Sequence, residues 1–332
     1  MSASVAASVG AQVSASTRTP TSAWAVASPC TSRCLMPPLS ARRGATARAP
    51  ASTVLRRYAA LAATVGGALA AGVRISDPPT LRRKAKAVLD ALGIILDATG
   101  PLRVPGTAAG TLIVANHISW LDVIAVLAVE PVPLIAKREV AGWPLVGPLA
   151  RRTGSRFINR EAVRELPGTV RALAAHLREG GSAVVFPQAT TWCTAPGGPF
   201  RRATFQAAID ARAPVRPLAI DFTQEGIRST AAAYVGGETL AASLRRVATT
   251  DGLATHVRAC PPLWPYGHDR LSLAAAAHSA VCDAVGRPAD MEHPAGPAAA
   301  ARLQPGRSAE RAAALYELGG AGSACEDFRP SP

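Results

Sequence analysis

The stretch GTLIVANHISWLDVIAVLAV, residues 110–129, changes from strand-like to helix-like sequence near its centre. Its first part, GTLIVA, is a short β-branched run that is typical of a buried strand. Its last part, Trp120 to Val129, is apolar and long enough for a buried helix. The polar string NHIS lies between them, at the carboxyl end of the predicted strand. Open α/β sheets place their ligand crevices at that edge.

Four polar side chains interrupt this apolar stretch, and two of them have a structural explanation. Ser119 and Asp122 form an S-x-x-D pattern, which predicts a capping box at the start of the helix. Asn116 and His117 need another reason. The carboxylate of Asp122 could accept a hydrogen bond from one ring nitrogen of His117 and leave the other nitrogen as a base. The alternative is a histidine that serves only the structure at the strand end.

The sequence on the carboxyl-terminal side repeats the same alternation. Short apolar runs predict strands at 132–137, 182–187 and 215–222. Helical periodicity predicts helices at 164–179, ending at a Gly-Gly pair, and at 200–211. Strands that alternate with helices of this length favour an α/β fold, with a mostly parallel sheet flanked by helices.

Residues 51–100 form a basic segment in front of this fold. The uncharged run Tyr58–Val73, bracketed by arginines, would span roughly 24 Å as a helix, less than the roughly 30 Å hydrocarbon core of a bilayer. It is therefore a poor transmembrane helix. The following segment places an apolar stripe on one helical face, made of Leu81, Ala85, Val88, Leu92 and Ile95.

Four cations occupy the first turns of that second helix, namely Arg82, Arg83, Lys84 and Lys86. One interpretation is a surface helix that packs on the core. The other is an interfacial helix on anionic lipid, because basic residues near such a surface are attracted to it. We therefore predict that residues 51–100 are membrane-associating helices that precede a domain at 101–287.

Both ends of the chain have low-complexity composition. Residues 1–50 are rich in Ala, Ser, Thr and Pro, and we expect a disordered tail there. Residues 288–332 are rich in Pro, Ala and Gly and are expected to be flexible. The six cysteines include no CxxC pair, which favours reduced thiols. Cys30 and Cys34 are four apart, but no second pair of ligands follows at zinc spacing, so we predict no metal site.

The net charge of +14 predicts an anionic partner. Nucleic-acid modules usually interleave basic residues with stacking aromatics, and only 5% of this chain is Phe, Trp or Tyr. Nucleic acid is therefore disfavoured, and a membrane surface or a phosphorylated substrate is favoured.

Four blocks in order give the chain a resemblance to a known family. NHISWLD (116–122) resembles the NHxSxxD block of the glycerolipid acyltransferases, the superfamily of 1-acylglycerol-3-phosphate O-acyltransferases. GSRFINR (154–160) is similar to the second block, FPQATT (186–191) to the third, and VRPL (215–218) to the fourth. The resemblance covers roughly residues 80–287. It implies transfer of a fatty acyl group from acyl-CoA or acyl carrier protein to the free hydroxyl of a lysophospholipid, with no cofactor and no metal.

The resemblance also implies roles for individual residues. His117 is the expected catalytic base and Asp122 its orienting partner. Arg160 would bind the lipid phosphate, because a guanidinium suits bidentate phosphate recognition. The full set of expected substrate-binding residues is Asn116, Gly154, Phe157, Arg160, Pro187, Gln188, Ala189, Thr190 and Pro217. Cys193 is the candidate for a covalent alternative, although no base is identifiable beside it.

The third block departs from the family pattern at two positions. Gln188 stands where the family usually has Glu, and Ala189 where it has Gly. A glutamine can still orient a hydroxyl but loses the charge, and an alanine resists positive φ. We expect Gln188→Glu to preserve or increase turnover on lysophosphatidate.

These departures leave three functions open. The favoured acceptor is 1-acyl-sn-glycerol-3-phosphate, which gives phosphatidate in phospholipid biosynthesis. The alternatives are another lyso-acceptor, such as a lyso-ornithine lipid, and a catalytically silent lipid- or acyl-CoA-binding homologue. A hydrolase is disfavoured because no G-x-S-x-G motif is present. A lysolipid acceptor resides in a membrane, so we expect the protein at the cytoplasmic face of the plasma membrane.

Overall fold

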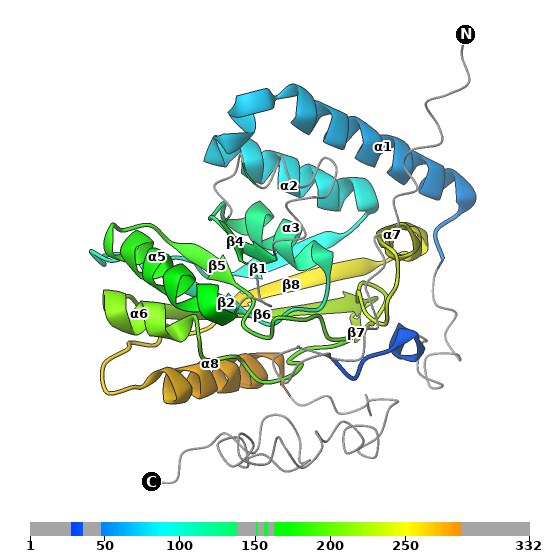
Figure 1. Cartoon of the computed structure of the whole chain (residues 1–332). Coiled ribbons are helices and arrows are strands. Elements are labelled where there is room, and N and C mark those ends of the chain that lie inside the picture. The colour runs from blue at the N-terminus through cyan, green and yellow to red at the C-terminus, as the bar shows by residue number, and fades with distance from the viewer. Residues whose placement is uncertain (1–27, 36–47, 138–150, 152–155, 159–162, 287–332) are drawn as a thin grey trace.

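A computed structural model describes residues 28–35, 48–137, 151, 156–158 and 163–286. Within this part of the chain, the main sheet has six strands (Figure 1). Their order is β1 (Ile95–Thr99), β8 (Leu253–Ala259), β6 (Val215–Gln224), β2 (Leu112–Ala115) and β5 (Ala183–Val185), with β7 (Ile227–Arg228) beside β6. A second small sheet pairs β3 (Ile135–Lys137) with β4 (Arg156–Ile158).

The predicted α/β sheet is confirmed, and its pairing is mixed. β1 runs parallel to β8, and β2 runs parallel to both β6 and β5. β6 is antiparallel to β8 and to β7. In the parallel part, Val114 of β2 lies opposite Pro217 of β6 and Val185 of β5. The carboxyl ends of β2 and β5 therefore lie side by side, and β6 continues past the end of β2 to Gln224.

Helices cover both faces of the sheet (Figure 1). α1 (Ala51–Ala70), α2 (Pro78–Leu92) and α3 (Trp120–Val129) stack on one face, and α8 (Arg270–Val285) packs on β6 from the other. α5 (Leu166–Arg178) packs on α6 (Phe205–Ala211), and α7 (Leu240–Thr249) contacts α1. The short 3-10 helices are η1 (Ser32–Leu35), η3 (Gly72–Ser76) and η5 (Val163–Glu165).

β2 is the centre of the core. All of its residues, Leu112 to Ala115, are 0% exposed. An apolar strand without polar alternation is what a sheet covered on both faces requires. Burial of side chains such as Leu and Ile contributes roughly 1.5–3 kcal/mol each, so this strand anchors the fold.

Two predicted helix boundaries differ from the structure. α2 ends at Leu92, because Gly93 adopts a left-handed conformation with φ of 71° and Ile94 N–H bonds back to Leu89 O. Ile95 therefore belongs to β1, where it is 65% exposed, and not to the apolar stripe of the helix. The helix expected from residue 200 begins at Phe205. The N–H of Arg201 bonds to Pro187 O, so Arg201 belongs to the loop that precedes α6.

Part of the predicted N-terminal tail is folded onto the core, so the expectation of disorder is wrong for residues 28–35. Cys30 and Cys34 are 6% and 3% exposed. Gly236 makes room for this segment, since a Cβ there would lie 2.4 Å from the backbone nitrogen of Ser32. Residues 1–27, 36–47 and 287–332 lie outside the described residues, and so do the tail predictions made for them.

The basic N-terminal helices are integrated with the fold. The guanidinium of Arg57 in α1 is buried and donates to the carbonyl oxygens of Ala248, at 2.9 Å, and Thr250, at 2.7 Å. It also pairs with Asp251 at 2.9 Å. This arginine therefore fastens α1 to the end of α7. Among the described residues, no helix has the length and hydropathy needed to cross a bilayer.

Candidate active site

The candidate site forms where two parallel strands end side by side. β2 ends at Ala115 and β5 ends at Val185, and these strands are hydrogen-bonded neighbours. The strings NHIS (116–119) and FPQAT (186–190) follow them directly. The sheet topology thus brings together two blocks that are about seventy residues apart in sequence, as the bond between His117 and Gln188 illustrates with a separation of 71.

A single carboxylate oxygen organises the turn between β2 and α3. Asp122 is 0% exposed, and its Oδ2 accepts from the backbone N–H of Ile118 at 2.6 Å and of Ser119 at 2.9 Å. The hydroxyl of Ser119 accepts from Leu121 N at 3.2 Å, which completes the predicted capping box. The same Oδ2 lies 2.8 Å from Nδ1 of His117.

This arrangement fixes the tautomer of the imidazole. Because Oδ2 of Asp122 already accepts two backbone hydrogen bonds, it acts as an acceptor, and Nδ1 of His117 carries the hydrogen. In the neutral ring Nε2 then keeps its lone pair. The His117 side chain is 18% exposed, so the ring is anchored from inside the protein and still reaches the surface.

Phe186 holds the plane of the imidazole. Its ring stacks on His117 with the centroids 4.2 Å apart and an angle of 26° between the planes. Phe186 begins the third block, and the sequence alone predicts no role for it. Its position directly after β5, the parallel neighbour of β2, explains why it lies beside His117.

Gln188 supports the backbone of His117 instead of facing outward. It is 3% exposed, and its Oε1 accepts from His117 N at 2.6 Å. Its Nε2 donates to the carbonyl oxygens of Pro196 and Gly198, both at 2.7 Å. An amide satisfies these three groups because it carries an acceptor and two donors. The side chain at this position is therefore matched to glutamine.

Ala189 retains the backbone geometry that usually favours glycine. Its φ is 59°, and its N–H bonds to Phe186 O at 3.0 Å, closing a turn over Phe186–Ala189. A left-handed conformation costs a residue with a Cβ about 1–2 kcal/mol. The turn that follows β5 is thus built with alanine, at a modest cost in strain.

The remaining predicted residues are spread over several environments. Asn116 is 0% exposed, and its side-chain amide pairs with both the N–H and the carbonyl of Ile220, each at 2.8 Å. Pro187 and Pro217 are buried, and Thr190 is half-buried. Phe157 lies in β4, where only the backbone is described. Gly154 and Arg160 lie outside the described residues, so the second block is not placed against His117.

Cys193 is unsuited to act as a nucleophile. It is 3% exposed, and its hydrogen bond with Cys30, together with burial, raises the pKa of its thiol well above the ordinary range. The reactive form of cysteine is the thiolate. The thiol therefore stays protonated near neutral pH, and the covalent alternative loses its candidate.

The segment after the turn is held from both sides. Trp192 N–H bonds to His117 O at 2.8 Å, and the hydroxyl of Thr191 donates to Tyr234 O. Below it, Phe200 packs edge-on against His278 of α8 with ring centroids 5.1 Å apart. Burial lowers the pKa of His278 to about 4, so this ring is neutral near physiological pH. Contacts with His117, Tyr234 and α8 therefore position the loop that receives the Gln188 amide.

Replacing Gln188 by Glu tests this support. Gln188→Glu would place a carboxylate oxygen against the carbonyl oxygens of Pro196 and Gly198, where two donated bonds now lie. We expect the free energy of unfolding at pH 7 to fall by roughly 2–4 kcal/mol in urea denaturation. The family pattern alone predicts preserved or increased turnover for this variant, whereas the hydrogen bonds of Gln188 predict a less stable protein. Gln206→Glu, on the exposed side of α6, is the control and should cost far less. Undiminished stability of Gln188→Glu would contradict the described hydrogen bonding.

Comparison with known proteins adds an independent observation. Residues 98–221 match the family model described as Acyltransferase. The matched region spans β1 to β6 and includes His117, Asp122 and Gln188.

Two curated proteins are similar in sequence to part of the chain. The chain is 39% identical over 146 residues to a 1-acyl-sn-glycerol-3-phosphate acyltransferase of Neisseria meningitidis serogroup B, covering 44% of this chain and 56% of that protein. It is 32% identical over 168 residues to a lyso-ornithine lipid O-acyltransferase of Pseudomonas aeruginosa, covering 51% and 65%. The chain thus spans less than two thirds of the length of these relatives.

A solved structure covers more of the chain at lower similarity. The 1-acyl-sn-glycerophosphate acyltransferase PlsC from Thermotoga maritima matches with a TM-score of 0.49 and 20% sequence identity, over 71% of this chain and 95% of that one. The family match and the relatives at 32–39% identity agree on one assignment. Residues 98–221 are therefore similar to the Acyltransferase family.

Proposed function

We propose that the protein transfers a fatty acyl group from a thioester, acyl-CoA or acyl carrier protein, to the free hydroxyl of a lysolipid. The observation that carries this proposal is the 2.8 Å contact between His117 Nδ1 and Asp122 Oδ2, with the ring partly exposed at a strand end. The match to the Acyltransferase family model and the two kinds of acyltransferase among the relatives support the same reaction.

The proposed chemistry uses His117 as a general base. A hydroxyl is a weak nucleophile near neutral pH, so Nε2 of His117 takes its proton while the oxygen attacks the thioester carbonyl. The carbon–sulfur bond then breaks, and the leaving thiolate receives the proton from the imidazolium. A positioned base contributes typically about 10²- to 10⁴-fold. Asp122, buried and anionic, stabilises the imidazolium that forms in between.

No covalent intermediate is needed in this scheme. The acceptor oxygen itself attacks the thioester, so neither a serine nor a cysteine nucleophile takes part. Ser119 is engaged as the cap of α3, and the Cys193 thiol is buried and protonated. We therefore assign the chemical step to His117 and Asp122 alone.

The favoured acceptor is 1-acyl-sn-glycerol-3-phosphate, with phosphatidate as product. The Neisseria relative, named for this acceptor, supports it at 39% identity. Lyso-ornithine lipid is the second candidate, supported by the Pseudomonas relative at 32% identity. In the first case Arg160 is the proposed phosphate ligand, so a charge reversal there should raise KM for the phosphorylated acceptor far more than KM for the acyl donor.

A direct assay separates these functions. Purified protein is incubated with a labelled acyl thioester and a panel of lyso-acceptors, and the lipid products are identified by chromatography. We expect acylated lysophosphatidate, and we expect His117→Ala to lower the rate by at least about 100-fold. His256→Ala is the matched control, because His256 also contacts an aspartate, Asp97, at 2.9 Å but lies elsewhere on the sheet.

Three outcomes would contradict parts of this proposal. Near-wild-type acyl transfer by His117→Ala would show that His117 is not the general base. Acylation of a lyso-ornithine acceptor alone replaces the favoured acceptor by the second candidate. A folded protein that binds acyl thioester without turnover is the silent homologue. The intact His117–Asp122 pair argues against this last function, because a protein that only binds does not need it.

We also propose that α2 docks the protein on an anionic membrane surface at the cytoplasmic face. Arg82, Arg83 and Lys86 are exposed and line one open hollow between α2 and β1. Leu55 and Leu69 of the adjacent α1 are 71% and 37% exposed and could enter the interface. Arg57 is buried against α7 and is excluded from this surface.

Charge removal tests the docking surface better than deletion, because deleting 51–100 would also remove α2 and β1 from the fold. We expect Arg82→Gln, Arg83→Gln and Lys86→Gln together to weaken binding to anionic vesicles by roughly 100-fold, since each cation contributes about 1 kcal/mol. The control removes the same charge from exposed arginines elsewhere, Arg171, Arg201 and Arg270. Equal sedimentation of both triple variants would refute α2 as the docking surface.

A further inference from the structure

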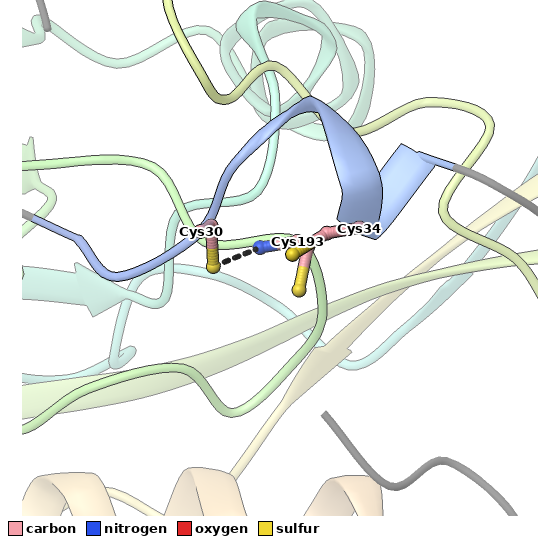
Figure 2. A group of neighbouring side chains, drawn as sticks. All are labelled: Cys30, Cys34 and Cys193. Atoms are coloured by element: carbon pink, nitrogen blue, oxygen red, sulfur yellow. Dashed lines mark hydrogen bonds between the residues drawn. The ribbon is translucent and has the colours of Figure 1, made fainter. Parts of the chain in front are cut away.

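Three cysteine sulfurs meet beside the loop that follows the candidate site. Figure 2 shows Cys30 and Cys34 of the N-terminal segment facing Cys193, which lies five positions after Gln188. The three Sγ atoms lie within 4.8 Å of one another. All three side chains are buried, at 6%, 3% and 3% exposure. The sequence predicts no metal site because no second pair of ligands follows Cys30 and Cys34 at zinc spacing, but the fold brings in Cys193, which lies 163 residues beyond Cys30.

The backbone around the cluster is preorganised. Cys34 N–H bonds to Thr31 O at 3.0 Å, and this turn brings Cys34 back towards Cys30. Cys193 N–H donates to the Sγ of Cys30 at 3.3 Å, the dashed line in Figure 2. A backbone N–H directed at sulfur favours the negatively charged thiolate. The backbone between Cys30 and Cys34 also lies close to Gly236, where a Cβ would be 2.4 Å from the nitrogen of Ser32.

The chemistry of the cluster points to a cation. Three buried sulfurs that lie within 4.8 Å of one another form a compact set of soft ligands for a single ion. A bound cation deprotonates coordinating thiols outright. Thiolates around a metal at about 2.3 Å stand about 3.8 Å apart in tetrahedral geometry. The three sulfurs lie within 4.8 Å of one another, so no pair is more than about 1 Å wider than that value.

We propose that Cys30, Cys34 and Cys193 bind a thiophilic d¹⁰ metal ion, for which Zn²⁺ is the probe. The C-x₃-C spacing of the first two ligands falls within the range of structural zinc sites, and soft thiolates select ions of this class. Within the described residues the cluster offers three sulfur ligands. The ion would tie the segment 28–35 to the loop that receives the Gln188 amide, and its role is structural.

Metal titration of the full chain tests the site without reference to acyl transfer. The protein is reduced, stripped with a chelator and titrated with Co²⁺, followed by displacement with Zn²⁺. We expect one equivalent per chain, with thiolate-to-cobalt charge-transfer absorption in the near-ultraviolet and a higher Tm in the zinc-loaded form. Cys34→Ser and Cys193→Ser should each weaken zinc binding by at least about 100-fold. Cys260→Ser is the control, because Cys260 is buried in the core outside the cluster.

Three results would overturn the proposal. The first is a wild-type chain that takes up no metal after reduction. The second is zinc affinity in Cys34→Ser or Cys193→Ser equal to that of Cys260→Ser. The third is a disulfide between two of the cluster cysteines, found by peptide mass spectrometry of the purified protein, together with no metal uptake after that disulfide is reduced. Because the wild-type titration needs no substitution, a variant that fails to fold leaves the test intact, and the outcome is independent of the proposed acyltransferase activity.

Discussion

The carboxylate of Asp122 is the interaction on which the candidate site depends. Its Oδ2 accepts from two backbone N–H groups and from the imidazole of His117, all within 2.9 Å, at a position that is 0% exposed. A buried charge is tolerated only when its hydrogen bonds are made. The turn after β2 provides the hydrogen bonds of Oδ2, and the same bonds begin α3 and set the orientation of His117. Capping and the proposed catalysis therefore share one group.

The rest of the fold brings support to that turn from distant parts of the chain. β5, the parallel neighbour of β2, delivers Phe186 to the face of the imidazole and Gln188 to the backbone N–H of His117. The Gln188 amide in turn needs the carbonyls of Pro196 and Gly198, in a loop that rests on α8 through Phe200. The proposed metal ion would fix the middle of that loop at Cys193. A chain of short contacts thus connects the sheet, the loop and the N-terminal segment.

Local patterns were predictable from the sequence, and long-range partners were not. The bounds of α3 and its capping box depend on residues within a few positions of Ser119, so both predictions are confirmed. The error at Ile95 came from following helical periodicity through Gly93, which ends α2. The backbone partners of Gln188 and the meeting of Cys30 with Cys193 depend on how loops cross in three dimensions, which spacing alone does not encode. The roles of Gly154 and Arg160 remain predictions.

The protonation pattern of His117 tests the central claim most directly. Nitrogen-15 NMR of the labelled protein distinguishes the two neutral tautomers, and comparison with His117→Ala assigns the signals. At a pH where the ring is neutral, the account predicts hydrogen on Nδ1, towards Asp122, and an unprotonated Nε2. A ring that carries its hydrogen on Nε2 would contradict the account, because the nitrogen proposed to accept the proton from the substrate would then have no lone pair available.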